Sequence, residues 1–222
     1  MCGRYTLTVD EELILVRFQS VKVTEEVYVK RYNIAPGQQV FAIVNDGEKN
    51  RLGTLRWGLI PPWAKDPKLG YKMINARGET LAEKPAFRRA FRRQRCLIPA
   101  DGFYEWKQMG KEKQPYYIRL KSGEPFAFAG LWERWPSPDG TVIHSCTIIT
   151  TKANEQLAEL HPRMPVILKK EDEALWLNRK CEDLALLQEL LRPYPGEEME
   201  IYPVSAEVNS AKNDYPSLIN KK

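Results

Sequence analysis

Between residues 96 and 150 the chain alternates short runs of β-branched and aromatic residues with residues typical of tight turns. The turn signals are Gly110, Ser122-Gly123 and the segment 136–140. Strands that follow one another through tight turns pair antiparallel. This rhythm therefore predicts antiparallel sheets folded into a barrel or a sandwich. The expected strands are Cys96–Pro99, Phe103–Lys107, Tyr116–Leu120, Phe126–Glu133 and Thr141–Thr150.

The rest of the chain adds three more strand signals and several short helices. Val40–Val44 and Leu52–Trp57 read as a hairpin through Asn45-Asp46-Gly47, and Met199–Val204 reads as a late strand. We expect helices at Asp10–Phe18, Pro85–Gln94, Asn154–Leu160, Glu171–Asn178 and Cys181–Leu191. Turn signals recur throughout, and no linker divides the chain. The prediction is one α+β domain over residues 1–222, with a strand-built core and short peripheral helices.

Charge is unevenly placed along the chain. From Lys65 to Arg119 there are 14 Lys or Arg and 6 Asp or Glu, an excess of 8 positive charges, whereas the net charge of the whole chain is +5. A basic stretch of this kind indicates either a positive face that attracts polyanions or a set of solvated surfaces. Charge alone leaves both interpretations open.

Cysteine and histidine usage argues against a metal centre. The chain has 4 Cys and 2 His, and none of the cysteines forms a C-x-x-C pair. No apolar run is long enough for a signal peptide or a membrane span. We expect a cytoplasmic monomer with free thiols that needs no metal and no cofactor. The cysteines are Cys2, Cys96, Cys146 and Cys181.

Cys2 stands at the start of the chain, where its small side chain permits removal of Met1. The mature chain would then begin with an amine and a thiol on adjacent carbons. The α-amine titrates near ~8, so a good share is neutral and nucleophilic at physiological pH. Such an amine forms an imine with an aldehyde, and the thiol then closes a thiazolidine ring. The alternative is that Cys2 is incidental or is buried as a small hydrophobe.

Two further residues are candidates for proton transfer. Glu105 lies in Phe103-Tyr104-Glu105-Trp106, where aromatic surroundings would push a carboxyl group towards its protonated form. The alternative is a rim glutamate paired with a neighbouring cation. His161 follows an expected helix, so it is either a proton-exchanging imidazole in a loop or a histidine at a helix C-terminus.

The remaining candidates suit a nucleic-acid strand. Alternation places Asn75 and Arg77 on one face of an extended segment, where they could orient an amine and clamp a phosphate. Arg4 lies near Cys2 and could also meet a phosphate. Trp63, in a Pro-rich loop, either stacks on a base or packs under the loop. The alternative for the Asn75–Arg77 segment is an ordinary amphipathic edge strand.

Taken together, these segments resemble the SOS response-associated peptidase family, also called abasic-site processing proteins. The resemblance starts at Met1-Cys2-Gly3-Arg4-Tyr5 and runs through most of the chain in order. Its further blocks are residues 31–37 (RYNIAPG), 56–61 (RWGLIP), 74–80 (INARGET), 95–106 (RCLIPADGFYEW), 161–165 (HPRMP), 203–205 (PVS) and 208–209 (VN).

The resemblance implies a groove for single-stranded DNA that contains abasic sites. It implies that Cys2 is the crosslinking nucleophile and that Asn75, Glu105 and His161 complete the catalytic site. The expected DNA contacts are Arg4, Arg77, Arg163, Trp63 and Pro36. Two other functions stay open: a cysteine peptidase that acts on other proteins, and a non-covalent single-strand binding module. Self-cleavage, which the word peptidase suggests, would remove only Met1.

Overall fold

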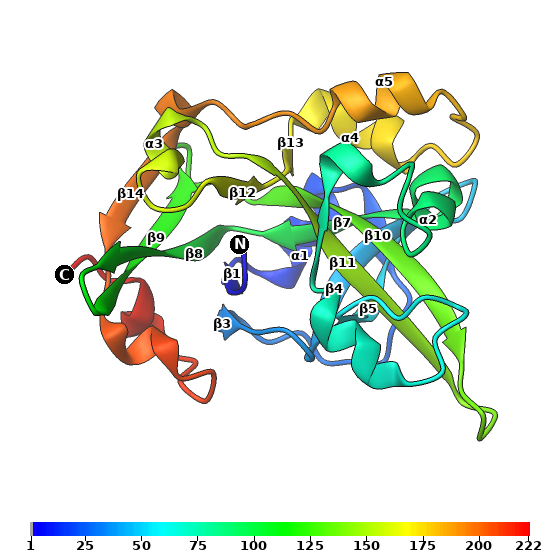
Figure 1. The fold of residues 1–222 in the computed structure, drawn as a ribbon, viewed down its shortest axis with the longest axis horizontal. Helices are drawn as coiled ribbons and strands as arrows, with labels where there is room; N and C mark the ends of the chain where they lie inside the picture. The colour runs from blue at the N-terminus through cyan, green and yellow to red at the C-terminus, as the bar shows by residue number, and fades with distance from the viewer. Residues whose placement is uncertain (1) are drawn as a thin grey trace.

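Five strands close into a barrel, which lies in the right-hand part of the view in Figure 1. Neighbouring strands pair antiparallel, except that β5 and β11 run parallel where Arg56 faces Ser145 and close the ring. In order around the ring they are β11 (Val142–Lys152), β10 (Phe126–Pro136), β7 (Arg95–Ala100), β4 (Gln39–Asn45) and β5 (Asn50–Trp57). The expected α+β class with a barrel core is confirmed.

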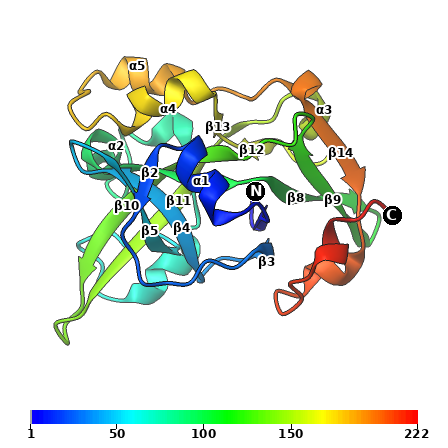
Figure 2. The same ribbon diagram turned by 180° about the vertical axis from the view of Figure 1, so that it is seen from behind.

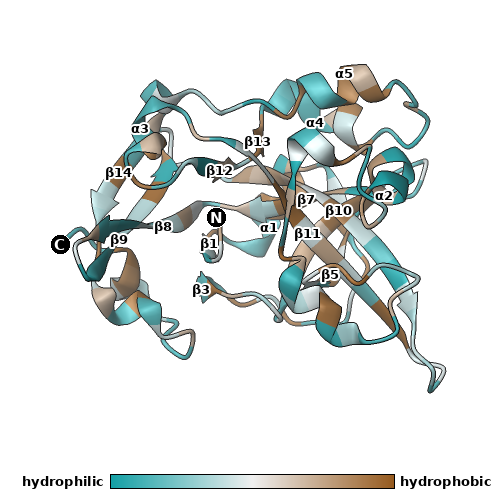
Figure 3. Cartoon of the chain, in the orientation of Figure 1, coloured by the Kyte–Doolittle hydropathy of each residue, from teal (hydrophilic) through white to brown (hydrophobic). Residues whose placement is uncertain are grey.

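Side chains fill the barrel. All six residues of β7 are buried, and hydrophobic residues concentrate in the central strands (Figure 3). The ring of Tyr5 makes edge contacts with Trp57 and Phe128, at centroid distances of 5.4 and 5.7 Å. At Gly130 an added Cβ would lie 2.8 Å from the sulfur of Cys96, so β10 carries no side chain there. A core packed this closely holds the strands in one register.

A second, five-stranded sheet stands beside the barrel and forms the other wall of the molecule (Figures 1 and 2). At Gly102 a Cβ would lie 2.1 Å from the hydroxyl of Tyr117, which itself bonds Thr6 at 2.8 Å. This close approach of β1, β8 and β9 fixes the start of β8. The strand order is β14 (Met199–Pro203), β9 (Glu112–Leu120), β8 (Gly102–Met109), β1 (Tyr5–Leu7) and β3 (Arg31–Ile34).

Short elements complete the fold. The five expected helices are all found where the sequence predicts them; four are shorter than expected, and the fourth in chain order keeps its length but starts one residue earlier. The helix expected from Pro85 begins only at Arg88, because residues 85–87 form a turn. The helices are α1 (Glu11–Arg17), α2 (Arg88–Arg93), α3 (Glu155–Ala158), α4 (Lys170–Leu177) and α5 (Leu184–Glu189), and the short strands are β2 (Ser20–Lys22), β6 (Asn75–Arg77), β12 (Arg163–Pro165) and β13 (Ile167–Leu168).

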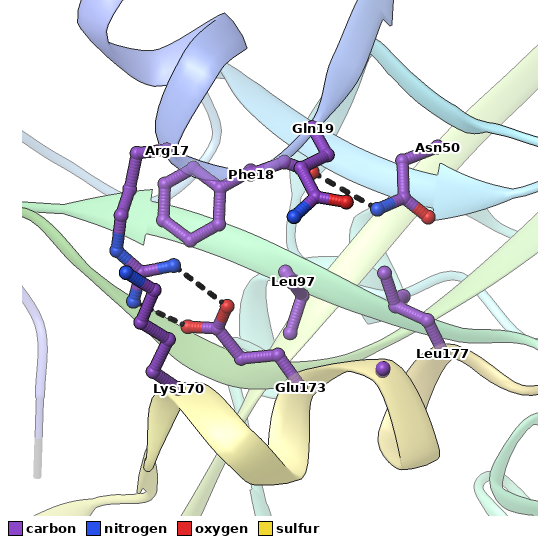
Figure 4. A pocket seen from close by; sticks show the side chains of 9 residues that line it. Arg17, Phe18, Gln19, Asn50, Leu97, Lys170, Glu173 and Leu177 are labelled. Atoms are coloured by element: carbon purple, nitrogen blue, oxygen red, sulfur yellow. Dashed lines mark hydrogen bonds and ion pairs between the residues drawn. The ribbon is translucent and has the colours of Figure 1, made fainter.

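An ion pair joins the first helix to the fourth across one side of the barrel. The guanidinium of Arg17 donates to both carboxylate oxygens of Glu173 at 2.9 Å, and it lies 4.6 Å from the ring centre of Phe18. Figure 4 shows the fork of Arg17 facing the carboxylate at the edge of a pocket floored by Leu97. Burial raises the pKa of Glu173, against the effect of Arg17. The pair therefore fixes where α1 sits on the barrel.

This computed structural model describes residues 2–222. The expected removal of Met1 therefore lies outside the described residues. No helix in the described part of the chain is long and apolar enough to cross a membrane. Within residues 2–222, no group of three or more His, Cys, Asp or Glu side chains is placed to hold a metal ion.

Candidate active site and nucleic-acid interface

Cys2 lies between the barrel and the second sheet, just ahead of β1. β1 pairs antiparallel with β8, with Tyr5 opposite Phe103. The backbone N–H of Tyr104 donates to the carbonyl of Arg4 at 3.0 Å, so the two segments stay together beyond the start of β1. Continued in this register, the chain brings residues 2–4 alongside residues 104–106. The N-terminal part of the chain is thereby held against Glu105.

The thiol of Cys2 is fully buried, and its sulfur lies 4.0 Å from the carbonyl oxygen of Arg4. Burial raises the pKa of this thiol well above its usual range, and the nearby carboxylate of Glu105 raises it further. Reactive cysteines work as thiolates, which need positive surroundings that lower the pKa. The surroundings of Cys2 in this chain therefore favour its protonated thiol over the thiolate.

Glu105 and His161 line the same cleft, whose volume is about 440 Å³. Glu105 comes from β8 and is only 3% exposed, whereas His161 follows α3 and is half-buried. Trp106 lies beside Glu105, and its indole N–H donates to the side-chain oxygen of Asn209 at 2.7 Å. The structure thus brings two of the predicted catalytic residues, Glu105 and His161, to one cleft. The full lining is Arg4, Glu105, Trp106, Lys113, His161 and Asn209.

The ring of His161 has a defined orientation. The backbone N–H of His161 donates to the carbonyl of Leu157 at 2.9 Å, which continues the turn of α3. The backbone N–H of Arg163 donates to its Nδ1 at 3.0 Å. Nδ1 also lies 3.1 Å from the carbonyl oxygen of Arg163, to which it donates in the tautomer that carries the ring proton there. Both contacts use Nδ1, and together they fix the plane of the ring.

Asn75 and Arg77 line a second cleft, of about 510 Å³, together with Trp63. β6 places both residues beside β11, where Asn75 pairs with Ile148. The amide of Asn75 donates to the carbonyl of Ile148 at 3.4 Å, and its buried Oδ1 accepts no hydrogen bond from residues 2–222. The indole of Trp63 is 58% exposed, so it does not pack under its loop. The remaining lining is Lys72, Met73, Thr80, Lys84, Pro85, Ala86 and Phe87.

Two of the expected phosphate contacts already have partners within the chain. The guanidinium of Arg163 makes a two-point contact with Glu79, at 2.6 and 2.9 Å, and also donates to the carbonyl of Thr150 at 2.6 Å. This contact lowers the pKa of Glu79. The guanidinium of Arg4 donates to Asn33 and to two backbone carbonyls in the segment 208–209, at 2.7 to 3.2 Å. Both arginines are held in fixed positions.

Pro36 lies in the turn between β3 and β4 and is half-buried. The following residue, Gly37, has φ +87°, and a Cβ there would lie 3.1 Å from the ring of Tyr71. Tyr71 is 59% exposed, and the guanidinium of Arg56 lies over its ring, 5.1 Å from the ring centre. Pro36 is thus next to an exposed aromatic and cationic surface.

The basic middle of the chain divides between structural and exposed positions. Arg95 is buried and donates to the carbonyls of Phe91, Arg92, Trp176 and Asn178 at 2.5 to 2.8 Å. Arg89 and Arg93 pair with Glu133 and Glu182. The run at 88–95 therefore serves largely to hold the fold. The basic residues that reach the two clefts are Arg4, Lys72, Arg77, Lys84 and Lys113.

Sequence reasoning did not single out Trp106, Lys113 or Asn209. For Lys113 a signal was available, because the hairpin turn at Gly110 brings the next strand back towards Glu105. Asn209 comes from the far end of the chain, and no local pattern connects it with Glu105.

The comparisons with known proteins give one consistent result. Residues 1–211 match the family model described as SOS response associated peptidase (SRAP). The abasic site processing protein YoqW of Bacillus subtilis is 55% identical over 221 residues, which cover 99% of each chain. The abasic site processing protein YedK of Escherichia coli is 30% identical over 224 residues, which again cover 99% of each. A crystal structure of a protein from Bacteroides thetaiotaomicron superimposes with a TM-score of 0.91 at 26% identity, and each chain is covered completely.

Proposed function

Because this chain belongs to the SOS response associated peptidase family, we propose that it processes abasic sites in single-stranded DNA by bonding Cys2 covalently to the sugar aldehyde. The observation that carries the proposal is that the buried Cys2 lies close to Glu105, which lines a cleft together with His161. A bond of this kind would shield the site from strand cleavage by β-elimination.

The first step exposes the aldehyde. An abasic deoxyribose exists mostly as a closed hemiacetal. Glu105 is 3% exposed on the wall of the cleft, and it gives a proton to the ring oxygen as the ring opens. A carboxyl group in hydrogen-bonding reach of that oxygen is suited to general acid catalysis. The conjugate carboxylate then takes up the proton that the hydroxyl group at C1′ loses.

The second step joins the amine to the aldehyde carbon. Removal of Met1 frees the α-amine of Cys2, and Asn75 orients it through its buried amide oxygen. The amine adds to the carbonyl, and the resulting carbinolamine loses water to give the imine. His161 lines the cleft and, in its protonated form, supplies the proton for the departing hydroxyl. The same group takes the proton back when the bond reverses.

The third step closes the ring. The sulfur of Cys2 adds to the imine carbon, its proton moves to the imine nitrogen, and a thiazolidine results. No redox partner, metal or cofactor enters this balance, because one water leaves and no electrons are transferred. The raised pKa of the thiol suits this order of events, since the amine attacks first and the thiol adds to an already activated carbon.

The same pKa argues against a peptidase that acts on other proteins. Such an enzyme needs a thiolate held beside its histidine base. Burial and Glu105 both oppose ionisation of Cys2. The DNA strand would instead lie along the exposed residues of the clefts. Its proposed contacts are Arg4, Arg77, Arg163, Trp63 and Pro36.

The test uses an oligonucleotide with one abasic site and denaturing electrophoresis. Wild-type protein should give a shifted band that survives heating. Cys2→Ala should abolish this band and leave non-covalent affinity nearly unchanged, because affinity comes from several phosphate contacts. Cys2→Ser should also fail, since a hydroxyl group closes the ring poorly. A stable adduct in normal yield from Cys2→Ala would overturn the assignment of the nucleophile.

A further inference from the structure

Lys113 lines the cleft that contains Glu105 and His161. We propose that Lys113 binds a phosphate of the DNA backbone next to the abasic nucleotide, an inference that rests on the proposed function of this cleft. The ligand class is therefore a phosphodiester, held by a cation that comes from β9 and not from any of the sequence motifs.

The cleft crosses the free edge of β8. In the β8–β9 hairpin Trp106 faces Pro115 and Gln108 faces Lys113, so Trp106 and Lys113 lie on one face and Glu105 on the other. β1 and the residues ahead of it cover the edge of β8 as far as Trp106, so the edge beyond Trp106, towards Gln108, is not covered by the N-terminal part of the chain. A strand whose sugar reaches Glu105 therefore continues past this edge to the side of Lys113.

Two Lys or Arg side chains, Arg4 and Lys113, line this cleft, and Lys113 is the one whose charged group forms no hydrogen bond or ion pair with another described residue. Both terminal nitrogens of the Arg4 guanidinium donate hydrogen bonds, to the side chain of Asn33 and to the carbonyls of residues 208 and 209. Lys113 is exposed, and none of the ion pairs among residues 2–222 involves it. The nearby Lys107, by contrast, pairs with Glu159 at 3.7 Å.

A phosphodiester fits what Lys113 offers. Its ammonium group is a point charge on a flexible stem, so it can follow a phosphate that moves as the sugar ring opens. Arg4 adds a fixed positive charge on the same wall of the cleft. Trp106 is anchored through Asn209 and bounds the space between them. An anion that enters here would meet two cations in a partly enclosed site, whereas a solvated surface lysine would have no such position relative to Glu105.

The matched control is Lys111, which sits in the turn of the same hairpin and does not line the cleft. Lys113→Gln and Lys111→Gln remove the same charge from the same hairpin. Binding is measured by fluorescence anisotropy on a single strand that carries a tetrahydrofuran in place of the abasic sugar, because this analogue cannot form the covalent bond. Each protein is titrated at several salt concentrations.

One phosphate contact on a single strand contributes about 0.7 to the slope of log K against log salt. Lys113→Gln should therefore bind more weakly and lower the magnitude of the slope by about 0.7. A fourfold rise in salt should then shrink the wild-type advantage about 2.6-fold. Lys111→Gln should keep the wild-type slope. Equal slopes for Lys113→Gln and the wild type would show a solvated lysine only and would overturn the inference. Failure of the wild type to bind or crosslink would instead refute the proposed function itself.

Discussion

Arg4→Ala should destabilise the whole protein, because Arg4 joins the first strand to the last turns of the chain. Its guanidinium donates to the side-chain oxygen of Asn33 at 3.0 Å and to the carbonyl of Val208 at 2.7 Å. Asn33 is fully buried, so the alanine variant would leave its oxygen without a donor. In the variant the carbonyl of Val208 would still accept a hydrogen bond from the side-chain amide of Asn33, at 3.2 Å. The carbonyl of Asn209, which Arg4 also contacts, is exposed to water.

The orphaned acceptor sets the size of the effect. A buried acceptor left without its donor costs about 1–3 kcal/mol, and a hydrogen bond from a charged group contributes roughly 1.5–3 kcal/mol. We count the Asn33 contact in full and the other two in part, which gives a loss of about 3 kcal/mol. In a protein of this size that corresponds to a fall in Tm of roughly 6–12 °C.

Thermal unfolding followed by circular dichroism measures this loss. The matched control is Arg119→Ala, because Arg119 forms an exposed ion pair with Glu200 and such pairs contribute at most about 1 kcal/mol. Arg4→Ala should melt well below Arg119→Ala. If the two variants melt together near the wild type, Arg4 does not hold the C-terminal turns in place, and the reasoning from its hydrogen bonds is refuted.

Three further predictions concern the reaction and the DNA contact. Glu105→Gln should slow crosslinking by roughly 10²-fold, the scale of a lost general acid. A substrate analogue whose aldehyde is already open should recover much of the rate. If the rate does not recover, Glu105 acts in a later step than ring opening. The crosslinking rate should rise with pH as the α-amine loses its proton near pH ~8, and it should show no second rise below about pH 10, since the raised pKa of the Cys2 thiol keeps it protonated. A second rise in that profile would contradict the amine-first order. Arg77→Ala should lower the magnitude of the salt slope by about 0.7, and an unchanged slope would give Arg77 a structural role only.

Much of the barrel was predictable from local pattern. β10 and β11 combine β-branched or aromatic residues with the turn signals at 136–140, and the β4–β5 hairpin follows from Asn45-Asp46-Gly47. The closure of the ring was not predictable, because the parallel contact between Arg56 and Ser145 joins strands that lie far apart in the chain. β1 was also missed, since its three residues are all buried and show no alternation. Tertiary pairing with β8 makes it a strand.

The site shows the same division. Cys2, Glu105 and His161 each stood out by chemistry or motif, and the fold brings Glu105 and His161 to one cleft. Their hydrogen-bond partners did not stand out. That the Nδ1 of His161 accepts the Arg163 N–H is a property of one loop geometry. That Glu79 fills the fork of Arg163 depends on how β6 and β12 flank β11. Such contacts become visible only once distant segments are placed together.

The measurement that tests the central claim most directly is the mass of the crosslinked protein, followed by peptide mapping. The thiazolidine mechanism predicts an adduct whose mass equals the protein without Met1 plus the oligonucleotide, less one water. The peptide that begins at Cys2 should carry the sugar remnant. A chain extended by one residue ahead of Cys2 has an amide in place of the amine and should form no stable adduct. A heat-stable adduct on that extended chain, or on a lysine of the wild type, would contradict the thiazolidine mechanism.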